Sequence, residues 1–337
     1  MATPTLLSLT TVAALLLVGC GTPTSPGHGQ TPTADERLAW YRGCWQAFNA
    51  AKFDQFSRCY DDKAQAQHSG YGKPDISGRA AIVAGARDFK KTFPDGRGEE
   101  VITLINGTRI MSVHVLHGTN TGPLTDPNGK SVAATGKPFG LMFGHLIQAA
   151  PDANIVQHEL GIMDAGTLDA QLGLSKAPSR TVINVSPIPV TTVKAANDAK
   201  EQANLKSEQA IFDAWNKHDE DTFESLIDDN YVCHCFADPS EGDFKSQRAS
   251  NQGLWRSFSD AQLSTHLWAA GDYVVAQGEL TGTNDGPIPS IAVQATGNHV
   301  EVPYLQLDRF ENGKLREEWL FYNVETLAAQ IAPGTRL

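Results

Sequence analysis

Residues 45–70, WQAFNAAKFDQFSRCYDDKAQAQHSG, decide the fold, because residues 212–237, FDAWNKHDEDTFESLIDDNYVCHCFA, repeat their pattern without a gap. Identical residues coincide, such as Asn49 with Asn216. Two further blocks recur in the same order, residues 118–123 at 282–287 and residues 167–171 at 326–330. Ordered self-similarity at a long period is the signature of a duplicated unit, so the chain contains two copies of one domain.

The composition describes a folded, acidic protein. The chain has 337 residues, which is long for one domain and sufficient for two, each able to bury a core. Hydrophobic residues make up 41% and charged residues 19%, a balance typical of globular chains. The net charge of -11 argues against nucleic acid as a partner, because an acidic chain offers no basic face to displace phosphate counterions.

The N-terminus carries features of an export signal. Residues 6–18 form an uncharged apolar run of signal-peptide length, too short to span a bilayer. The run ends in Leu17-Val18-Gly19-Cys20, which resembles the bacterial lipobox, in which the cysteine becomes the lipid-modified first residue. The alternative is an ordinary buried segment with an accidental cysteine, since no Lys or Arg precedes the run.

On the first interpretation, residues 1–20 are a lipoprotein signal peptide and residues 21–33 a flexible, Pro- and Gly-rich tether. The lipidated Cys20 would then attach the protein to a membrane of the cell envelope. We expect the protein to face the periplasm of a bacterium.

Export places the remaining cysteines in an oxidising compartment, where disulfides form. Cys44 and Cys59 lie in the first two helices expected for copy one, and apolar residues replace both in copy two. Two interpretations remain for this pair, a disulfide or two buried thiols. Cys233 and Cys235 share a strand face but lie too close in sequence for an easy bridge. No second Cys or His cluster of suitable spacing accompanies them, so no metal site is predicted.

Each copy is expected to contain helices packed on one face of a curved antiparallel sheet, an α+β domain. We assign residues 34–173 to domain 1, 174–203 to the linker and 204–334 to domain 2. Asn49 and Asn216 are expected to take the left-handed conformation that ends the first helix. The expected first helices are residues 34–51 and 195–217, and the expected strands are 109–117 and 273–281, 139–148 and 300–310, and 155–164 and 315–323.

Four motifs carry a resemblance to a known family. They are Trp-Asn-x-x-Asp after the first helix, Gly-Thr-x-x-Gly-Pro at a strand end, a Thr-Gly-Lys or Thr-Gly-Asn turn, and GKLREEW at residues 313–319. Together they resemble the SnoaL-like polyketide cyclase family of the nuclear transport factor 2 superfamily. The resemblance implies two cone-shaped domains, each with a bent sheet that wraps around helices and leaves an apolar pocket. Relatives include cyclases, isomerases, dehydratases and members without catalysis, so the fold leaves the function open.

Catalytic members of the family move a proton from carbon with a carboxyl or histidine base in an apolar pocket. In the last strand of copy one, strict alternation places His158 and Asp164 on the inner face and Glu159 on the outer face. His158 and Asp164 are therefore the predicted bases. His145 and His114 share strand faces with apolar residues and are predicted to line the same pocket. The alternative is that each histidine is partly buried, has its own hydrogen-bond partners and shares no pocket with the others.

Other polar and aromatic residues are predicted to contact a ligand. Gln67 and His234 align between the copies on the strand that lines the cone. The histidine usual in the family's Gly-Thr-His-x-Gly pattern is Asn120 in copy one and Asn284 in copy two. The predicted ligand contacts are Gln67, Tyr60, Phe143, Asn120, His234, Tyr304, Glu317, Trp319 and Asn323.

Three functions compete on this sequence. The first is a lipid-anchored module that binds a small hydrophobic molecule, favoured because the two copies share no acid–base set. The second is a cyclase- or isomerase-type enzyme that works from domain 1. The third is a non-catalytic structural domain whose two sheets form an intramolecular pseudo-dimer. No cofactor is predicted.

Overall fold

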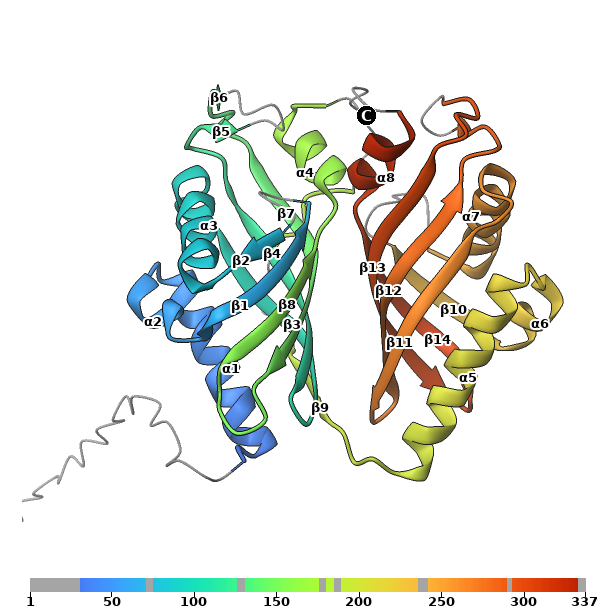
Figure 1. The fold of residues 1–337 in the computed structure, drawn as a ribbon, viewed down its shortest axis with the longest axis horizontal. Helices are drawn as coiled ribbons and strands as arrows, with labels where there is room; N and C mark the ends of the chain where they lie inside the picture. Colours follow the sequence, from blue (N-terminus) through green and yellow to red (C-terminus); the bar gives the residue numbers. More distant parts are fainter. Residues whose placement is uncertain are drawn as a thin grey trace, which may run out of the picture.

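The computed structural model contains two cones that stand side by side, with one sheet facing the other (Figure 1). The described residues are 31–70, 75–125, 131–175, 180–184, 189–235, 242–289 and 293–332. The predicted signal peptide, the lipidation site Cys20 and most of the tether lie outside them. Within the described ranges, every helix is too short or too polar to cross a membrane.

Each domain opens with two helices and closes with a short one. The helices of domain 1 are α1 (Ala34–Asn49), α2 (Phe53–Ser57), α3 (Arg79–Thr92) and α4 (Ala165–Leu172). Those of domain 2 are α5 (Ala199–Asn216), α6 (Glu220–Ser225), α7 (Phe244–Ser257) and α8 (Val324–Ile331). In Figure 1, α1 to α3 cover the outer side of one sheet, and α5 to α7 cover the outer side of the other.

The strands confirm the predicted α+β class. In domain 1 they are β1 (Tyr60–Ser69), β2 (Asp75–Ser77), β3 (Arg97–Asn106), β4 (Arg109–Thr119), β5 (Leu124–Thr125), β6 (Ser131–Val132), β7 (Pro138–Ala149) and β8 (Val156–Ile162). In domain 2 they are β10 (Ile227–Cys235), β11 (Gln262–Ala270), β12 (Tyr273–Thr283), β13 (His299–Glu311) and β14 (Lys314–Tyr322), and β9 (Thr191–Lys194) comes from the segment between the domains.

Each domain has one large curved sheet. The strand order is β2-β1-β8-β7-β4-β3-β9 in domain 1 and β10-β14-β13-β12-β11 in domain 2. Most neighbours are antiparallel, but β1 runs parallel to β8 and β10 runs parallel to β14. Strand β9 adds to the edge of the first sheet, parallel to β3. Part of the predicted linker is thus built into domain 1.

The corner after the first helix differs from the expectation. The left-handed residues are Ala51 (φ 53°) and His218 (φ 55°), not the asparagines. The Asn49 amide instead donates to Gly98 O and accepts from Gly98 N, both at 2.9 Å. Asn216 makes the same pair of bonds with Leu263. The prediction was wrong because the side-chain amides tie the helix ends to β3 and β11.

The sequence patterns did not indicate α7, the third helix of domain 2. Its buried residues include Gln247, Asn251 and Ser257, so the helix has no continuous apolar stripe. Both buried amides have polar partners in the interior of the cone. Asn251 Oδ1 accepts from Trp215 Nε1 at 3.2 Å, and Gln247 Oε1 lies 3.8 Å from Cys235 Sγ.

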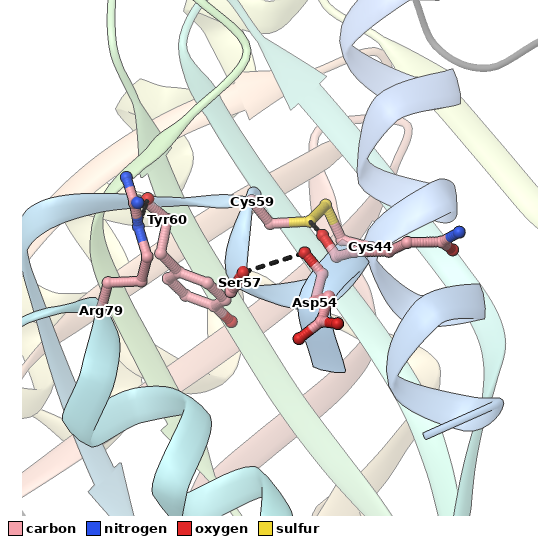
Figure 2. Close-up of a disulfide and its surroundings, with 7 residues drawn as sticks. Cys44, Asp54, Ser57, Cys59, Tyr60 and Arg79 are labelled. Atoms are coloured by element: carbon pink, nitrogen blue, oxygen red, sulfur yellow. Dashed lines mark hydrogen bonds between the residues drawn. A yellow bond between two sulfur atoms is a disulfide. The ribbon is translucent and has the colours of Figure 1, made fainter. Parts of the chain in front are cut away.

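A disulfide joins Cys44 in α1 to Cys59 after α2, with Cα atoms 6.1 Å apart (Figure 2). Within the last turn of α2, Ser57 Oγ donates to Asp54 O at 2.9 Å. Arg79 Nε of α3 donates to Tyr60 O at 2.7 Å. The covalent bond and these hydrogen bonds hold α1, α3 and the start of β1 together.

A separate hydrophobic core lies between the two sheets. Domain 1 contributes Leu104 and Met111, and domain 2 contributes Leu305, Trp319 and Phe321, all buried. Gly144 allows close approach, since a Cβ atom there would lie 2.7 Å from Phe321 Cγ. The two domains therefore pack against each other through their sheets, as a pseudo-dimer within one chain.

Candidate functional site

Two predicted histidines of domain 1 meet in one buried hydrogen-bond network. The Tyr41 hydroxyl lies 2.7 Å from His145 Nδ1 and 2.5 Å from Ser112 Oγ. Ser112 Oγ in turn lies 3.1 Å from His114 Nδ1. Burial, followed by the nearby His145, lowers the pKa of His114 well below its usual value, so His114 is neutral near pH 7. Tyr41, from α1, connects the two histidines of β4 and β7.

Glu159 extends this network to the protein surface. Its Oε1 atom lies 3.5 Å from His145 Nε2 and 2.6 Å from His68 Nε2. Burial by itself raises the pKa of Glu159, but His145 and His68 together outweigh it and hold the pKa well below its usual value. The His68 side chain is 27% exposed, whereas that of Glu159 is 5% exposed. A buried carboxylate is thus reached from solvent through one histidine.

Aromatic rings surround the network. The Trp45 ring stacks on His114 with centroids 4.0 Å apart, and Phe143 stacks on His145 at 5.5 Å. Tyr60 is also buried, and burial followed by the charge of Glu159 raises its pKa. Glu159 Oε2 has no hydrogen-bond partner among the described residues. The Glu159 carboxylate thus lies between the Tyr60 hydroxyl, with which it interacts, and flat apolar surfaces.

The predicted base His158 does not belong to this network. Val156 and His158 pair with adjacent residues of β7, so Gln157 is an extra residue on β8. Beyond this β-bulge, Glu159 faces the cone and His158 is exposed. The prediction for His158 was wrong because strict alternation fails across an inserted residue.

The predicted base Asp164 is a helix cap between the domains. Its Oδ2 accepts from Thr167 N at 2.7 Å, and its Oδ1 accepts from Val324 N of α8 at 3.2 Å. Asn323, predicted to contact a ligand, has the equivalent position, and its Oδ1 accepts from Ala165 N of α4 at 3.1 Å. Both predictions were wrong, because these side chains satisfy the first-turn N–H groups of α4 and α8.

Asn120 is also structural rather than ligand-binding. It is fully buried, its Nδ2 donates to Gly122 O at 2.8 Å, and its Oδ1 accepts from Thr135 N at 2.7 Å. Asn284 makes the equivalent bonds in domain 2. Because these amides hold the turns that follow β4 and β12, neither is directed at a ligand.

Three predicted contacts of domain 2 lie outside its cone. Arg316 is an extra residue on β14, since Leu315 and Glu317 pair with adjacent residues of β13. Glu317 therefore faces outward, where its Oε1 lies 3.0 Å from His234 Nε2. Trp319 stacks on His234 and packs between the sheets. The predictions for Glu317 and Trp319 were wrong for the same reason as that for His158. The prediction for His234 was wrong because its side chain on β10 lies on the outward face beside Glu317.

The remaining predicted contacts divide between surface and interior. Gln67 is exposed on β1, beside Leu160 of β8. Phe143 is half-buried and Tyr60 buried in the cone of domain 1. Tyr304 is buried in the cone of domain 2, where its hydroxyl donates to Ser264 O at 2.9 Å.

The cone of domain 2 contains acids where domain 1 has the histidine network. Glu208 occupies the position of Tyr41, and Asp308 lies nearby on β13. Burial, reinforced by Glu318 and partly offset by a hydrogen bond with Asp308, raises the pKa of Glu208 to about 8. Burial and the neighbouring Glu208 also raise the pKa of Asp308. This pair therefore retains a proton at neutral pH.

Glu159 and Glu318 were not predicted as site residues, although the sequence contains a signal for both. They occupy the same position in the two copies, at the offset of 159 set by the last repeated block. Each faces the interior of its cone and is buried. A carboxyl group that both copies retain on an inner face indicates a site. Strict alternation of side chains along the strand, however, predicted that this group lies on the outer face of the sheet.

Two small hollows are present among the described residues. The two best-formed hollows have volumes of about 10 Å³ each, room for about one water molecule. One lies against α6 and α7, lined by Phe223 and Trp255, and the other lies near α4, lined by Leu141 and Thr167. Pockets for drug-sized ligands occupy roughly 300–1,000 Å³, so a ligand of that size would enter either hollow only by displacing side chains.

Comparison with known proteins assigns both halves to related families. Residues 207–331 match the family described as SnoaL-like polyketide cyclase, and residues 40–158 match the family described as SnoaL-like domain. A search of curated proteins gives no match.

Three solved structures with similarity to this chain each match about two fifths of it. A protein of Jannaschia sp. CCS1 described as a SnoaL-like polyketide cyclase is 20% identical, with 41% of this chain and 97% of that chain covered and a TM-score of 0.38. TsrD from Streptomyces laurentii is 20% identical over 40% and 98% of the chains, with a TM-score of 0.36. IdmH from Streptomyces antibioticus, described as a polyketide cyclase, is 21% identical over 38% and 96%, with a TM-score of 0.35.

Proposed function

The chain belongs to the SnoaL-like family through both of its halves, and we propose on that premise that domain 1 binds a small, flat, largely apolar molecule with a hydroxyl or carbonyl group. One observation carries the proposal: a chain of polar contacts runs from half-exposed His68 through Glu159 and His145 to Tyr41. Buried polar groups of this number are costly unless they serve structure or a ligand.

The surroundings of Glu159 support a ligand of this chemistry. Its Oε2 atom, without a partner among the described residues, is available to accept a hydrogen bond from a ligand hydroxyl. Trp45 and Phe143 provide flat faces for an aromatic or conjugated ring. Polyketides, which the family name mentions, combine fused rings with hydroxyl and carbonyl groups.

Phe143 is the side chain that we expect to move on binding. It is half-buried and lies over Gly161, where a Cβ atom would come within 2.7 Å of Phe143 Cζ and 3.0 Å of His68 Cδ2. Phe143 thus covers Glu159 at the edge marked by His68. A rotation of this ring opens the network to solvent without a change of backbone.

Binding can be tested with hydroxylated anthraquinones as probes. We expect wild-type protein to bind one probe molecule per chain by calorimetry, and Glu159→Gln to bind about 10- to 100-fold more weakly, the loss of one charged hydrogen bond. His158→Gln is the matched control, because His158 is exposed on the same strand. Equal affinity for wild type and Glu159→Gln, or no binding by the wild type together with no small molecule in organic extracts of protein from its native host, contradicts the proposal.

An enzyme is the second candidate, favoured by the order of Glu159, His145 and Tyr41. A carboxylate that fixes one ring nitrogen of a histidine leaves the other to exchange a proton, here with the Tyr41 hydroxyl. Such a unit can add or remove a proton at a ligand carbon. Deuterium incorporation from D2O into a bound probe, lost in Tyr41→Phe while binding is retained, identifies the enzyme; binding without incorporation identifies a carrier.

We also propose that the protein is exported and anchored through Cys20. The apolar run and lipobox-like sequence support this, and the Cys44–Cys59 disulfide is typical of an oxidising compartment. Mass spectrometry of the mature protein from its native host should give an N-terminal diacylated or triacylated Cys20. An intact Met1 in that protein would refute the anchor and leave the ligand proposal unaffected.

A further inference from the structure

Two thiols and a carboxylate converge inside the cone of domain 2. Strands β10 and β14 are parallel neighbours, and Cys233 lies directly opposite Glu318 in their register. Cys235, two residues further along β10, faces the same way. All three side chains are at most 4% exposed, and their ligand atoms lie within 4.8 Å of one another. Residues from the two strands thus form a compact, buried group of potential metal ligands.

The distances describe the group in more detail. Cys233 Sγ lies 2.6 Å from Cys235 Sγ and 3.9 Å from Glu318 Oε1. Gln247 Oε1 of α7 lies 3.8 Å from Cys235 Sγ. The Tyr231 hydroxyl donates to Glu318 Oε2 at 2.7 Å. One face of the group is therefore closed by an amide oxygen, and the carboxylate is oriented by a tyrosine.

We propose that this group binds a soft divalent metal ion of the zinc class, with Cys233, Cys235 and Glu318 as ligands and Gln247 Oε1 as the fourth donor. Thiolates favour zinc and its heavier relatives, and a carboxylate is a common third ligand. Tyr231 acts behind the ligands, because its hydrogen bond fixes the direction of the carboxylate. Small side-chain rotations separate the two sulfurs so that each can contact one ion.

Two further carboxyl groups lie buried in the same cone. Glu208 and Asp308 are fully buried in the same domain. The two carboxyl groups interact with each other, and Asp308 Oδ1 has no further hydrogen-bond partner among the described residues. None of the ion pairs between described residues involves either carboxyl group. A bound divalent ion would offset the cost of burying so many acidic groups together.

A disulfide between Cys233 and Cys235 is the competing explanation for their proximity. Residues two apart on an extended strand have Cα atoms about 6.6 Å apart, near the upper limit for a disulfide. The Sγ atoms of Cys233 and Cys235 lie 2.6 Å apart, beyond the S–S bond length of about 2.05 Å, whereas Cys44 and Cys59 of the same chain are joined. Metal coordination explains how two adjacent thiols persist in a chain that also carries a disulfide.

Domain 1 provides the comparison within the molecule. Its equivalent positions hold Ala66, His68 and Glu159, so the carboxylate is retained but neither thiol is present. There the carboxylate is paired with two histidines instead. The metal site is therefore specific to domain 2 and independent of the ligand proposed for domain 1.

The test measures metal and thiols in the full-length mature protein. Purified without chelators, it should contain about one equivalent of zinc per chain by plasma mass spectrometry. Cd²⁺ added to metal-free protein during refolding should give the near-ultraviolet absorption of cadmium–thiolate bonds. No zinc in the purified protein together with no cadmium–thiolate band overturns the proposal. A Cys233–Cys235 disulfide found by peptide mapping without reduction also overturns it.

Adjacent glutamates supply a matched pair of variants. Glu318→Gln should lose the metal, whereas Glu317→Gln, which changes the outward-facing neighbour, should retain it. Tyr231→Phe should weaken cadmium binding by about 10- to 100-fold, as expected for a residue that orients a ligand. Circular dichroism verifies that each variant is folded. Equal metal content in folded Glu318→Gln and Glu317→Gln excludes Glu318 as a ligand and contradicts the proposal.

Discussion

Asp164 and Asn323 each cap a helix of their own domain and reach across to the equivalent helix of the other. Asp164 begins α4 and accepts a hydrogen bond from Val324 N of α8. Asn323 begins α8 and accepts one from Ala165 N of α4. Figure 1 shows α4 and α8 side by side between the two cones. The two equivalent N-cap residues therefore begin their own helices and also link the two domains by hydrogen bonds.

This exchange predicts that the two caps are energetically coupled. We expect Asp164→Ala and Asn323→Ala each to lower the free energy of unfolding by about 1–3 kcal/mol, because each leaves buried N–H groups unpaired in both domains. The double variant should deviate from the sum by at least about 0.5 kcal/mol. Urea unfolding provides the measurement. Asp198→Ala, which removes a cap within domain 2 alone, is the control and should be additive with Asn323→Ala.

A second prediction concerns the pH dependence of stability. The pKa of Glu208 is raised to about 8 in the folded protein, above the ordinary value of 4.5 that a glutamate has in the unfolded chain. Between these values the folded state holds a proton that the unfolded state has released, so the unfolding free energy should fall as pH rises through this window. Glu208→Gln should flatten that decline. Exposed Glu224→Gln should leave the profile unchanged, and an equal slope in both variants would rule out Glu208 as its source.

The disulfide predicts a contribution to stability that depends on reducing agent. Cys44 and Cys59 are 15 residues apart in sequence, and a loop of this size corresponds to about 3 kcal/mol in the chain-entropy model. Reduction of the wild type should lower the unfolding free energy by about this amount. The double variant Cys44→Ala/Cys59→Ala should have the lower unfolding free energy from the start, and reducing agent should not lower it further. Because this variant retains Cys233 and Cys235, it also tests whether those two cysteines respond to reduction. A full response in the double variant would assign the effect to the other two cysteines.

The close contact between the sheets predicts that a single methyl group at Gly144 is harmful. A Cβ atom there would lie 2.7 Å from Phe321 Cγ and 3.2 Å from Leu305 Cδ2 of domain 2. Gly144→Ala should therefore destabilise the protein by about 1–3 kcal/mol. Gly43→Ala is the control, because nothing lies within 4 Å of its Cβ position in α1. It should be neutral or stabilising by up to about 1 kcal/mol through helix propensity. Equal Tm values for the two variants would contradict the packing of the sheets.

The sequence by itself determined the duplicated architecture. The repeated helix corners and turns predicted two α+β domains, since such positions depend on local backbone geometry. Comparison of the two copies also predicted structural roles for Asn49 and Asn216. In the structure, the two side chains make the same contacts with the backbone. Local chemistry of this kind is readable from the chain.

Tertiary structure alone decided which side chains face the interior of each cone. One inserted residue on β8 turned His158 outward and Glu159 inward, and Arg316 had the same effect on Glu317 and Glu318. A bulge is set by pairing with a neighbouring strand, so it leaves no local pattern in the sequence. The groups that surround Glu159 and Glu318 come from strands and helices far apart in the chain, and only folding brings them together.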